Sequence, residues 1–355
     1  MIKYLGSKRT MVGALGDVAE AAGARTAVDL FTGTTRVAQE FKRRGLDVTA
    51  TDVASYSGVL ADCYIATDAG TVDPGELDEV LARLNALPGR AGYFTDTFCK
   101  QARFFNPING VRVDAIRDEI EATYRTSPLY PILLTSLMEA ADRVDSTTGV
   151  QMAYLKKWAP RALKSLNLRA PALIPGTGST VVGDAMTTVD RLAPADLMYL
   201  DPPYNHHSYR GNYHVWETLV RWDAPATYGV ARKRVDIQDA DTKSVFNRKR
   251  DMPEALASLF ARARAKTLVV SYNNESWIDA EQMDRMLRDA GREEVGTLAF
   301  EKNRYVGARI GIHNNTGQKV GQVGATKNLE YVFIAGEPDV VQECVRAGRP
   351  HGAVA

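Results

Sequence analysis

Four consecutive residues, Asp201, Pro202, Pro203 and Tyr204, combine a carboxylate, bare backbone carbonyls and an aromatic ring directly after the apolar run 197–200. Proline has no backbone N–H, so the two prolines leave carbonyl acceptors and no amide donors. The Asp201 carboxylate and the Pro202 carbonyl could accept both hydrogens of an amine on a planar ring, with Tyr204 stacked on that ring. A Pro-Pro pair can simply end a strand. Asp before it and Tyr after it favour a catalytic site made of all four residues.

A second candidate site is the turn that runs from Asp29 through Phe31 to Gly33, with Asp52 ending the next predicted strand. An acidic residue at this distance from a strand-to-helix glycine turn commonly bonds the hydroxyls of a ribose. A dinucleotide site would need a Gly-x-Gly-x-x-Gly sequence to receive a pyrophosphate, and only one glycine is present. S-adenosylmethionine fits better, since it carries adenosine and an amino acid without pyrophosphate. Many α/β turns share this pattern.

Two weaker signals complete the set. At the N-terminus, Tyr4 and Lys8 flank Gly6, and Lys8 could hold the carboxylate of the same ligand. Asp184 follows a predicted strand and could reach its adenine. A basic tail and a plain turn are the alternative explanations of these two segments.

Alternating strand and helix patterns must position these residues. An apolar strand, a glycine turn, an amphipathic helix and a second strand form a β-α-β unit, whose strands are parallel. The stretch 57–168 is instead mostly helical, and the α/β pattern resumes at 179. Predicted strands cover 27–31, 47–51, 180–182, 196–200, 267–272, 294–300 and 331–335, and predicted helices cover 37–44, 74–87, 113–124, 130–142 and 278–290.

The simplest organisation is one parallel α/β domain, 1–56 plus 169–355, interrupted by a helical insertion, 57–168. The segment 304–327 is glycine-rich and polar and is predicted to be a loop or a mobile hairpin. The insertion holds aromatic and basic residues that we expect to be exposed: Tyr93, Phe94, Phe98, Phe104, Phe105, Lys156, Lys157, Trp158, Arg161 and Lys164.

Composition limits the remaining classes. The 355 residues are 45% hydrophobic and 25% charged, which is typical of a folded soluble protein. No apolar run approaches a membrane span, and the N-terminus lacks a secretory signal. The three cysteines lie far apart, so we expect neither a disulfide framework nor a metal site. We also expect a cytoplasmic location. The net charge of +1 shows no overall preference for nucleic acid.

These elements, in this order, resemble the Dam-type N6-adenine DNA methyltransferases, a class I family that uses S-adenosylmethionine. Members carry an aromatic-x-Gly-x-Lys motif, a Phe-x-Gly-x-Gly motif, a target-recognition insertion and then Asp-Pro-Pro-Tyr. The resemblance covers nearly the whole chain. One departure is that Thr35 stands where the family has its second glycine.

The resemblance implies a Rossmann-like α/β methyltransferase sheet with a mostly helical target-recognition insertion. It implies direct transfer of the sulfonium methyl group to N6 of an adenine that is flipped out of duplex DNA. Asp201 to Tyr204 would hold the base. The residues carried over to cofactor binding are Tyr4, Lys8, Asp29, Phe31, Gly33, Asp52, Asp184 and Asp201.

Local charge supports a DNA-contacting face, because basic residues outnumber acidic ones between 205 and 250. Such clusters are often only solvated surface. The candidates for DNA contact are Asn205, His207, Tyr209, Arg232, Lys233, Arg234, Lys156 and Lys157. The chain carries no nuclease motif, so it would act either in restriction-modification, with the endonuclease as a separate protein, or as an orphan methylase. We expect a monomer.

Other reactions remain open. An N4-cytosine DNA methyltransferase uses the same chemistry but usually has Ser in place of Asp201. An RNA-base or protein-glutamine methyltransferase more often has Asn there and would not explain the N-terminal motif. A binding module without catalysis would tolerate loss of Asp201, Asp52 or Gly33, and all three are present.

Overall fold

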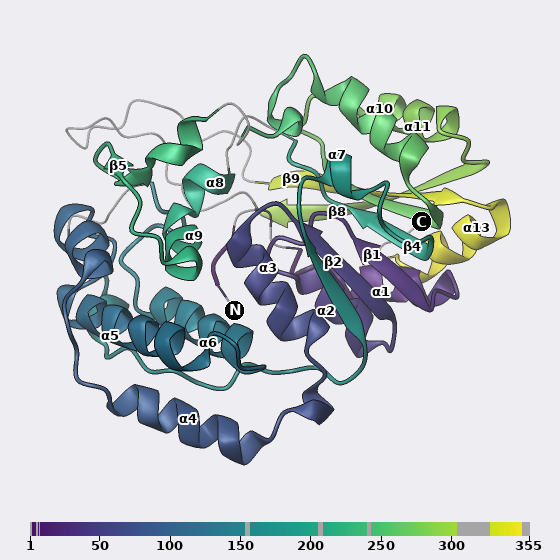
Figure 1. Ribbon diagram of the computed structural model, residues 1–355. Coiled ribbons are helices and arrows are strands. Elements are labelled where there is room, and N and C mark those ends of the chain that lie inside the picture. The colour runs from purple at the N-terminus through teal and green to yellow at the C-terminus, as the bar shows by residue number, and fades with distance from the viewer. Residues whose placement is uncertain are drawn as a thin grey trace. The chain divides into compact units, whose positions relative to one another are not determined.

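The β-α-β unit predicted near the N-terminus is present as β1 (Thr26–Asp29), α2 (Arg36–Arg43) and β2 (Asp47–Asp52). The computed structural model describes residues 2–4, 6, 8–152, 157–204, 209–239, 243–303 and 327–349 (Figure 1). Its contacts define two units. The first comprises 1–7, 32–184 and 207–244, and the second comprises 8–31, 185–206 and 245–355. The boundaries of these units differ from those of the predicted catalytic domain and insertion. The division into those two parts describes function and stays a prediction.

Five strands of the second unit lie side by side in the order β1, β4 (Ala195–Leu200), β7 (Ala265–Asn273), β9 (Lys327–Gly336) and β8 (Glu294–Asn303). The pairs β1–β4 and β4–β7 are parallel, as predicted. The expectation of a wholly parallel sheet is wrong for the last two strands, since β9 runs antiparallel to both β7 and β8.

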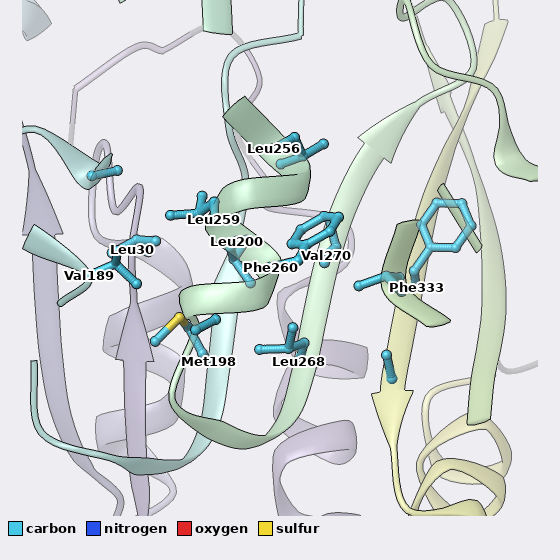
Figure 2. Close-up of a cluster of buried hydrophobic side chains, with 14 of the residues drawn as sticks. Leu30, Val189, Met198, Leu200, Leu256, Leu259, Phe260, Leu268, Val270 and Phe333 are labelled. Carbon is cyan, nitrogen blue, oxygen red and sulfur yellow. The ribbon is translucent and has the colours of Figure 1, made fainter. Parts of the chain in front are cut away.

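Alternate residues of these strands form the core of the second unit. On one face, Leu30, Met198, Leu200 and Val270 pack against the helix α10 (Met252–Arg262) (Figure 2). The strands that carry them are buried as near-continuous apolar runs, as expected for strands with both faces covered. The remaining helices of this unit are α1 (Val12–Ala21), α7 (Ala185–Thr188), α11 (Ala280–Asp289) and α13 (Pro338–Ala347), with the short turn η7 (Val245–Asn247).

In the first unit, β2 pairs in parallel with β3 (Gly178–Val182), so that Asp52 lies opposite Val182. The strand β3 is only partly covered. The helix α3 (Ser55–Ala61) follows β2 directly and packs close to β3, because a Cβ on Gly58 would lie 2.4 Å from the Val182 side chain.

The predicted helices of the insertion are confirmed. They are α4 (Pro74–Ala86), α5 (Pro107–Tyr124) and α6 (Tyr130–Arg143). The helix α5 begins six residues earlier than predicted, because the side chain of Asn106 caps it there. Shorter turns accompany them: η1 (Asp62–Ala66), η2 (Ala69–Thr71), η3 (Thr95–Gln101) and η4 (Pro160–Leu163).

The expectation that the aromatic residues of the insertion are exposed is wrong for its four phenylalanines, whereas Tyr93 and Trp158 are partly exposed. Phe94, Phe98, Phe104 and Phe105 are at most 1% exposed. They pack against one another and against the helix α9 (His214–Arg221), where Phe105 meets the ring of Trp216 edge-on. These rings therefore build the interior of the first unit.

The first unit ends with a small helix and a hairpin. These are α8 (Tyr209–Asn212), the two-residue strands β5 (Thr227–Tyr228) and β6 (Lys233–Arg234), and the turn η5 (Val235–Gln238). The predicted loop 304–327 lies outside the described residues, except for its last position. Among the described helices, none combines the length and apolarity needed to cross a membrane.

Candidate active site

Asp201 follows β4 directly, at the carboxyl end of a parallel strand, where open α/β sheets bind their ligands. Pro202 is buried, whereas Asp201, Pro203 and Tyr204 are partly exposed. The ring of Tyr204 meets that of Tyr272, on β7, edge-on at 5.8 Å between centroids. Burial raises the pKa of Tyr204, so its phenol is neutral at physiological pH. The four motif residues thus present a carboxylate, a carbonyl and a fixed ring.

A buried ammonium holds the Asp201 carboxylate. The side chain of Lys8 is only 4% exposed, and its Nζ lies 2.9 Å from Oδ1 of Asp201. The same Nζ donates to Oε1 of Glu330, a fully buried residue of β9. Burial opposes the charged form of Lys8, but the carboxylates of Asp201 and Glu330 raise its pKa well above the ordinary value. We name these three residues the Lys8 cluster.

Two residues predicted to bind the cofactor are packed inside the second unit. Asp29 is 1% exposed and lies opposite Tyr199 of β4, whose hydroxyl donates to Ser271 at 2.8 Å. The ring of Phe31 is partly buried and meets Phe246 edge-on at 5.3 Å. Both residues support the end of the strands, and their contact with a cofactor stays a prediction.

The glycine turn of the first unit is tied to Asp52. The backbone N–H of Gly33 donates to Oδ2 of Asp52, and that of Ala54 donates to Oδ1, each at 2.9 Å. Burial raises the pKa of Asp52 despite these bonds. Each carboxylate oxygen has a further lone pair, so Asp52 can still accept from hydroxyl groups. Gly33 has a φ of +52°, and a Cβ there would lie 3.2 Å from the ring of Tyr4.

Thr35, which stands in place of the family's second glycine, adopts the conformation that a glycine would supply. Its φ is +61°, in the left-handed region that costs a residue with a Cβ about 1 kcal/mol. Its hydroxyl donates to the carbonyl of Thr34 at 2.7 Å and accepts from the amide of Gln39 at 2.8 Å. These bonds offset part of the strain at the start of α2.

The ring of Tyr4 belongs to a stack of three tyrosines. Its centroid lies 4.6 Å from that of Tyr213 and 5.4 Å from that of Tyr209, with the planes within 22° of parallel. The hydroxyl of Tyr56 approaches the hydroxyl of Tyr4 at 3.5 Å. Burial raises the pKa of Tyr4, so this phenol is neutral. This tyrosine stack brings together Tyr4, predicted to bind the cofactor, and Tyr209, predicted to contact DNA.

Apolar side chains lie exposed beside Asp52. Val53 is 42% exposed, and Val182, opposite Asp52 in the neighbouring strand, is 55% exposed. Asp184 follows two residues later and is exposed. The ends of β2 and β3 thus present a carboxylate that can accept from hydroxyl groups, an exposed apolar surface and a second acceptor. These are the groups that an adenosine needs.

A family model for the D12 class N6 adenine-specific DNA methyltransferases matches residues 4–285. The chain belongs to this family. It is 32% identical over 285 residues to the type II methyltransferase M.NlaIII of Neisseria lactamica, covering 77% of this chain and 82% of that protein. It is 27% identical over 316 residues to the type II methyltransferase M.FokI of Planomicrobium okeanokoites, covering 83% of this chain and 48% of that one.

Membership confirms the predicted family, the Rossmann-like fold and the reaction type. This D12 methyltransferase is an enzyme that methylates adenine in DNA. Its family also uses S-adenosylmethionine, and the Asp52 region has the groups that such a ligand requires. Among the described residues, no group of three or more His, Cys, Asp or Glu side chains is arranged to hold a metal ion.

The basic run 232–234 divides into two kinds of residue. Arg232 and Lys233 are partly exposed on the hairpin. Arg234 is 2% exposed, and its guanidinium makes 2.7 Å contacts with the carboxylates of Asp223 and Asp236. A guanidinium that is buried and already paired does not suit a phosphate contact. The expected DNA contact of Arg234 is therefore corrected to a structural role in the hairpin.

The structure describes only some of the other DNA-contact candidates. Lys157 is exposed, and Tyr209 lies in the tyrosine stack. Asn205, His207 and Lys156 lie outside the described residues.

Three residues near these groups were given no role from the sequence, although Tyr213 and Glu217 belong to stretches that resemble the family. Glu330 sits in an apolar strand on the same side as the buried Val332, and this alternation was the signal that its carboxylate is buried. Tyr213 completes the tyrosine stack. Glu217 accepts from the backbone N–H of Ser55 at 3.0 Å, at the start of α3. The contacts of the last two could not be predicted, because both contacts join segments far apart in sequence.

Proposed function

We propose that this D12 methyltransferase transfers the methyl group of S-adenosylmethionine to N6 of an adenine flipped out of duplex DNA. The observation that carries the proposal is Asp201, an acceptor at the end of β4 held by the ammonium of Lys8 next to the donor-free Pro202. The relatives named above are type II methyltransferases. We therefore also propose that the modification protects DNA from a separately encoded restriction endonuclease, and that the enzyme acts as a monomer.

The target base is held by the motif. The Asp201 carboxylate and the Pro202 carbonyl accept the two N6 hydrogens, which localises the nitrogen lone pair and makes it a better nucleophile. Hydrogen bonds to a charged acceptor contribute about 1.5–3 kcal/mol each. Tyr204 stacks on the base, and Tyr272 fixes its ring from the edge. As N6 gains positive charge, the Asp201 carboxylate stabilises it, and the surplus N6 proton passes to water.

The cofactor is bound mainly by residues near the ends of β2 and β3. Asp52 accepts from the ribose hydroxyls, Val53 and Val182 cover the purine, and Asp184 accepts from its amine. When bound, S-adenosylmethionine supplies an electrophilic methyl group on a sulfonium sulfur, which leaves as a neutral thioether. Tyr4 supports the turn at Gly33, where its ring leaves no room for a Cβ. Asp29 and Phe31 are carried over from the sequence as further proposed cofactor contacts.

The phosphate contacts are made by Arg232, Lys233 and Lys157, because these three residues are partly or fully exposed. Four further DNA contacts are proposed from the sequence: Tyr209, Asn205, His207 and Lys156. Flipping the adenine costs a few kcal/mol, which these backbone contacts offset. The helical insertion is proposed to read the sequence around the target.

The test is product analysis. The purified chain is incubated with unmethylated duplex DNA and labelled S-adenosylmethionine, and the nucleosides are separated by mass spectrometry. We expect N6-methyladenine, with little transfer to an RNA of the same sequence. N4-methylcytosine as the product would overturn the base assignment and keep the mechanism. Cofactor binding without transfer to DNA would overturn the proposed substrate.

A further inference from the structure

We propose that Glu330 is a positioning residue for methyl transfer: by engaging Lys8, it leaves Asp201 with net negative charge toward the target adenine. The inference rests on the proposed function, since it assigns a task within that reaction. Glu330 lies beyond the residues that the family model matches, 4–285.

The geometry is a single ammonium between two carboxylates. Nζ of Lys8 lies 2.9 Å from Asp201 and in contact with Oε1 of Glu330. The exposed fractions of the side chains are 4% for Lys8, 20% for Asp201 and 0% for Glu330. Only Asp201 reaches solvent to any extent, so it is the member of the Lys8 cluster that a ligand can meet.

The backbone fixes Glu330 in this position. It lies in β9, opposite Asn273 of β7, and β9 is paired on both sides along this stretch. On the same side of the strand, Val332 and Ile334 are fully buried. A carboxylate buried among such residues is costly unless it is paired, and Lys8 supplies the pair.

The charges explain why two carboxylates are needed. With Lys8 and Glu330 paired, the cluster carries a net charge of −1, centred on the exposed Asp201. Without the charge of Glu330, the same ammonium would neutralise Asp201 alone. N6 becomes positive as the new N–C bond forms and the C–S bond breaks with its electrons going to sulfur. A net negative acceptor stabilises that change, and a neutral pair does so less.

A merely structural ion pair makes a different prediction from this one. Glu330→Gln keeps the shape and gives a cluster charge of zero, Lys8→Met gives −2, and the double variant Lys8→Met/Glu330→Gln returns to −1. If net charge at Asp201 is what matters, the double variant is more active than Glu330→Gln, because removing Lys8 restores the charge of −1. If the contacts are only structural, the double variant is no better than Glu330→Gln, since it also loses the contact between Lys8 and Asp201.

The experiment measures kcat, KM for duplex DNA and the dissociation constant of S-adenosylmethionine for these variants of the full chain. We expect Glu330→Gln to lower kcat about 10- to 100-fold with both binding constants changed less than threefold. The double variant should exceed Glu330→Gln in kcat by about tenfold. A double variant no faster than Glu330→Gln, or wild-type kcat in Glu330→Gln, overturns the inference while leaving the proposed function intact.

Glu330→Asp is the second comparison, in case the double variant does not fold. It keeps the charge but shortens the side chain, so it should retain more kcat than Glu330→Gln even where its melting temperature is equal or lower. Activities that follow the melting temperatures instead would overturn the inference. A wild-type chain that makes no N6-methyladenine overturns the proposed function, and this inference with it.

Discussion

At the scale of single residues, the chemistry depends on one carboxylate whose neighbours fix its charge and direction. Asp201 is held by Lys8 and remains 20% exposed, and Pro202 removes the competing amide donor beside it. The sequence predicted this acceptor group in full, because its parts are contiguous. It could not predict that Glu330 contacts Lys8, because Glu330 lies on a strand more than a hundred residues later in the sequence.

Replacing the acceptor should affect the chemistry more than the binding of cofactor. We expect Asp201→Ala to lower the rate of methyl transfer about 10²- to 10⁴-fold, the range for losing an interaction that strengthens in the transition state. Isothermal titration should still detect S-adenosylmethionine binding. Asp190→Ala, at an exposed carboxylate paired with Arg262, is the control and should retain wild-type turnover. Near-normal turnover of Asp201→Ala would remove Asp201 from the mechanism.

A second single-residue prediction concerns the turn. Gly33→Ala combines a positive φ with a Cβ 3.2 Å from the ring of Tyr4, so the ring must move. We expect cofactor affinity to fall at least tenfold. Gly45→Ala is the matched control, because its φ is +85° and its Cβ would meet open space. It should lower the melting temperature and leave the affinity unchanged. Equal effects of the two on affinity would separate Gly33 from the cofactor site.

At the scale of elements, local patterns predicted most helices and strands but not their partners. Apolar runs and caps identified α4, α6 and the strands β4 and β7. Strand direction was predicted only where a helix intervened, so the antiparallel β9 was missed. The phenylalanines of the insertion lacked a clear helical period, because they lie on a π-helical turn and its flanks, and their burial depends on α9.

The hairpin β5–β6 gives an element-scale prediction. If Arg232 and Lys233 each neutralise a phosphate, Ala at both positions should make the slope of log affinity against log salt shallower by about 2. Arg346→Ala, on the exposed face of α13, is the control and should not change the slope. Fluorescence anisotropy with a labelled duplex over a salt series measures it. An unchanged slope in the double variant would exclude these two contacts.

Arg234→Ala tests the corrected role of its neighbour in the same hairpin. It leaves the carboxylates of Asp223 and Asp236 with the half-exposed Arg221 as their remaining shared partner, so the free energy of unfolding should fall by about 1–3 kcal/mol. Thermal melts measure this loss. A variant of full stability with a shallower salt slope would restore Arg234 as a phosphate contact.

At the scale of the whole molecule, composition indicated a folded soluble chain but not the state of its three thiols. Cys63 and Cys99 lie in the first unit and Cys344 in the second, and all three are buried. Burial raises the pKa of Cys63 to about 12 and of Cys344 to about 11, and it raises that of Cys99 as well. Since the thiolate is the reactive form, native thiols should be inert at pH 8 in both units.

These thiols also link stability to pH. The unfolded chain loses its thiol protons near the ordinary pKa of 9.0, whereas the folded chain keeps them, so the unfolded state binds fewer protons above that pH. Stability should therefore fall as the pH rises from 9 to 10, by up to about 1.4 kcal/mol per thiol. Urea melts at pH 8, 9 and 10 measure the loss, and a triple Cys→Ser variant should show less of it. Rapid labelling of any thiol in the native protein at pH 8 would contradict the burial on which the argument depends.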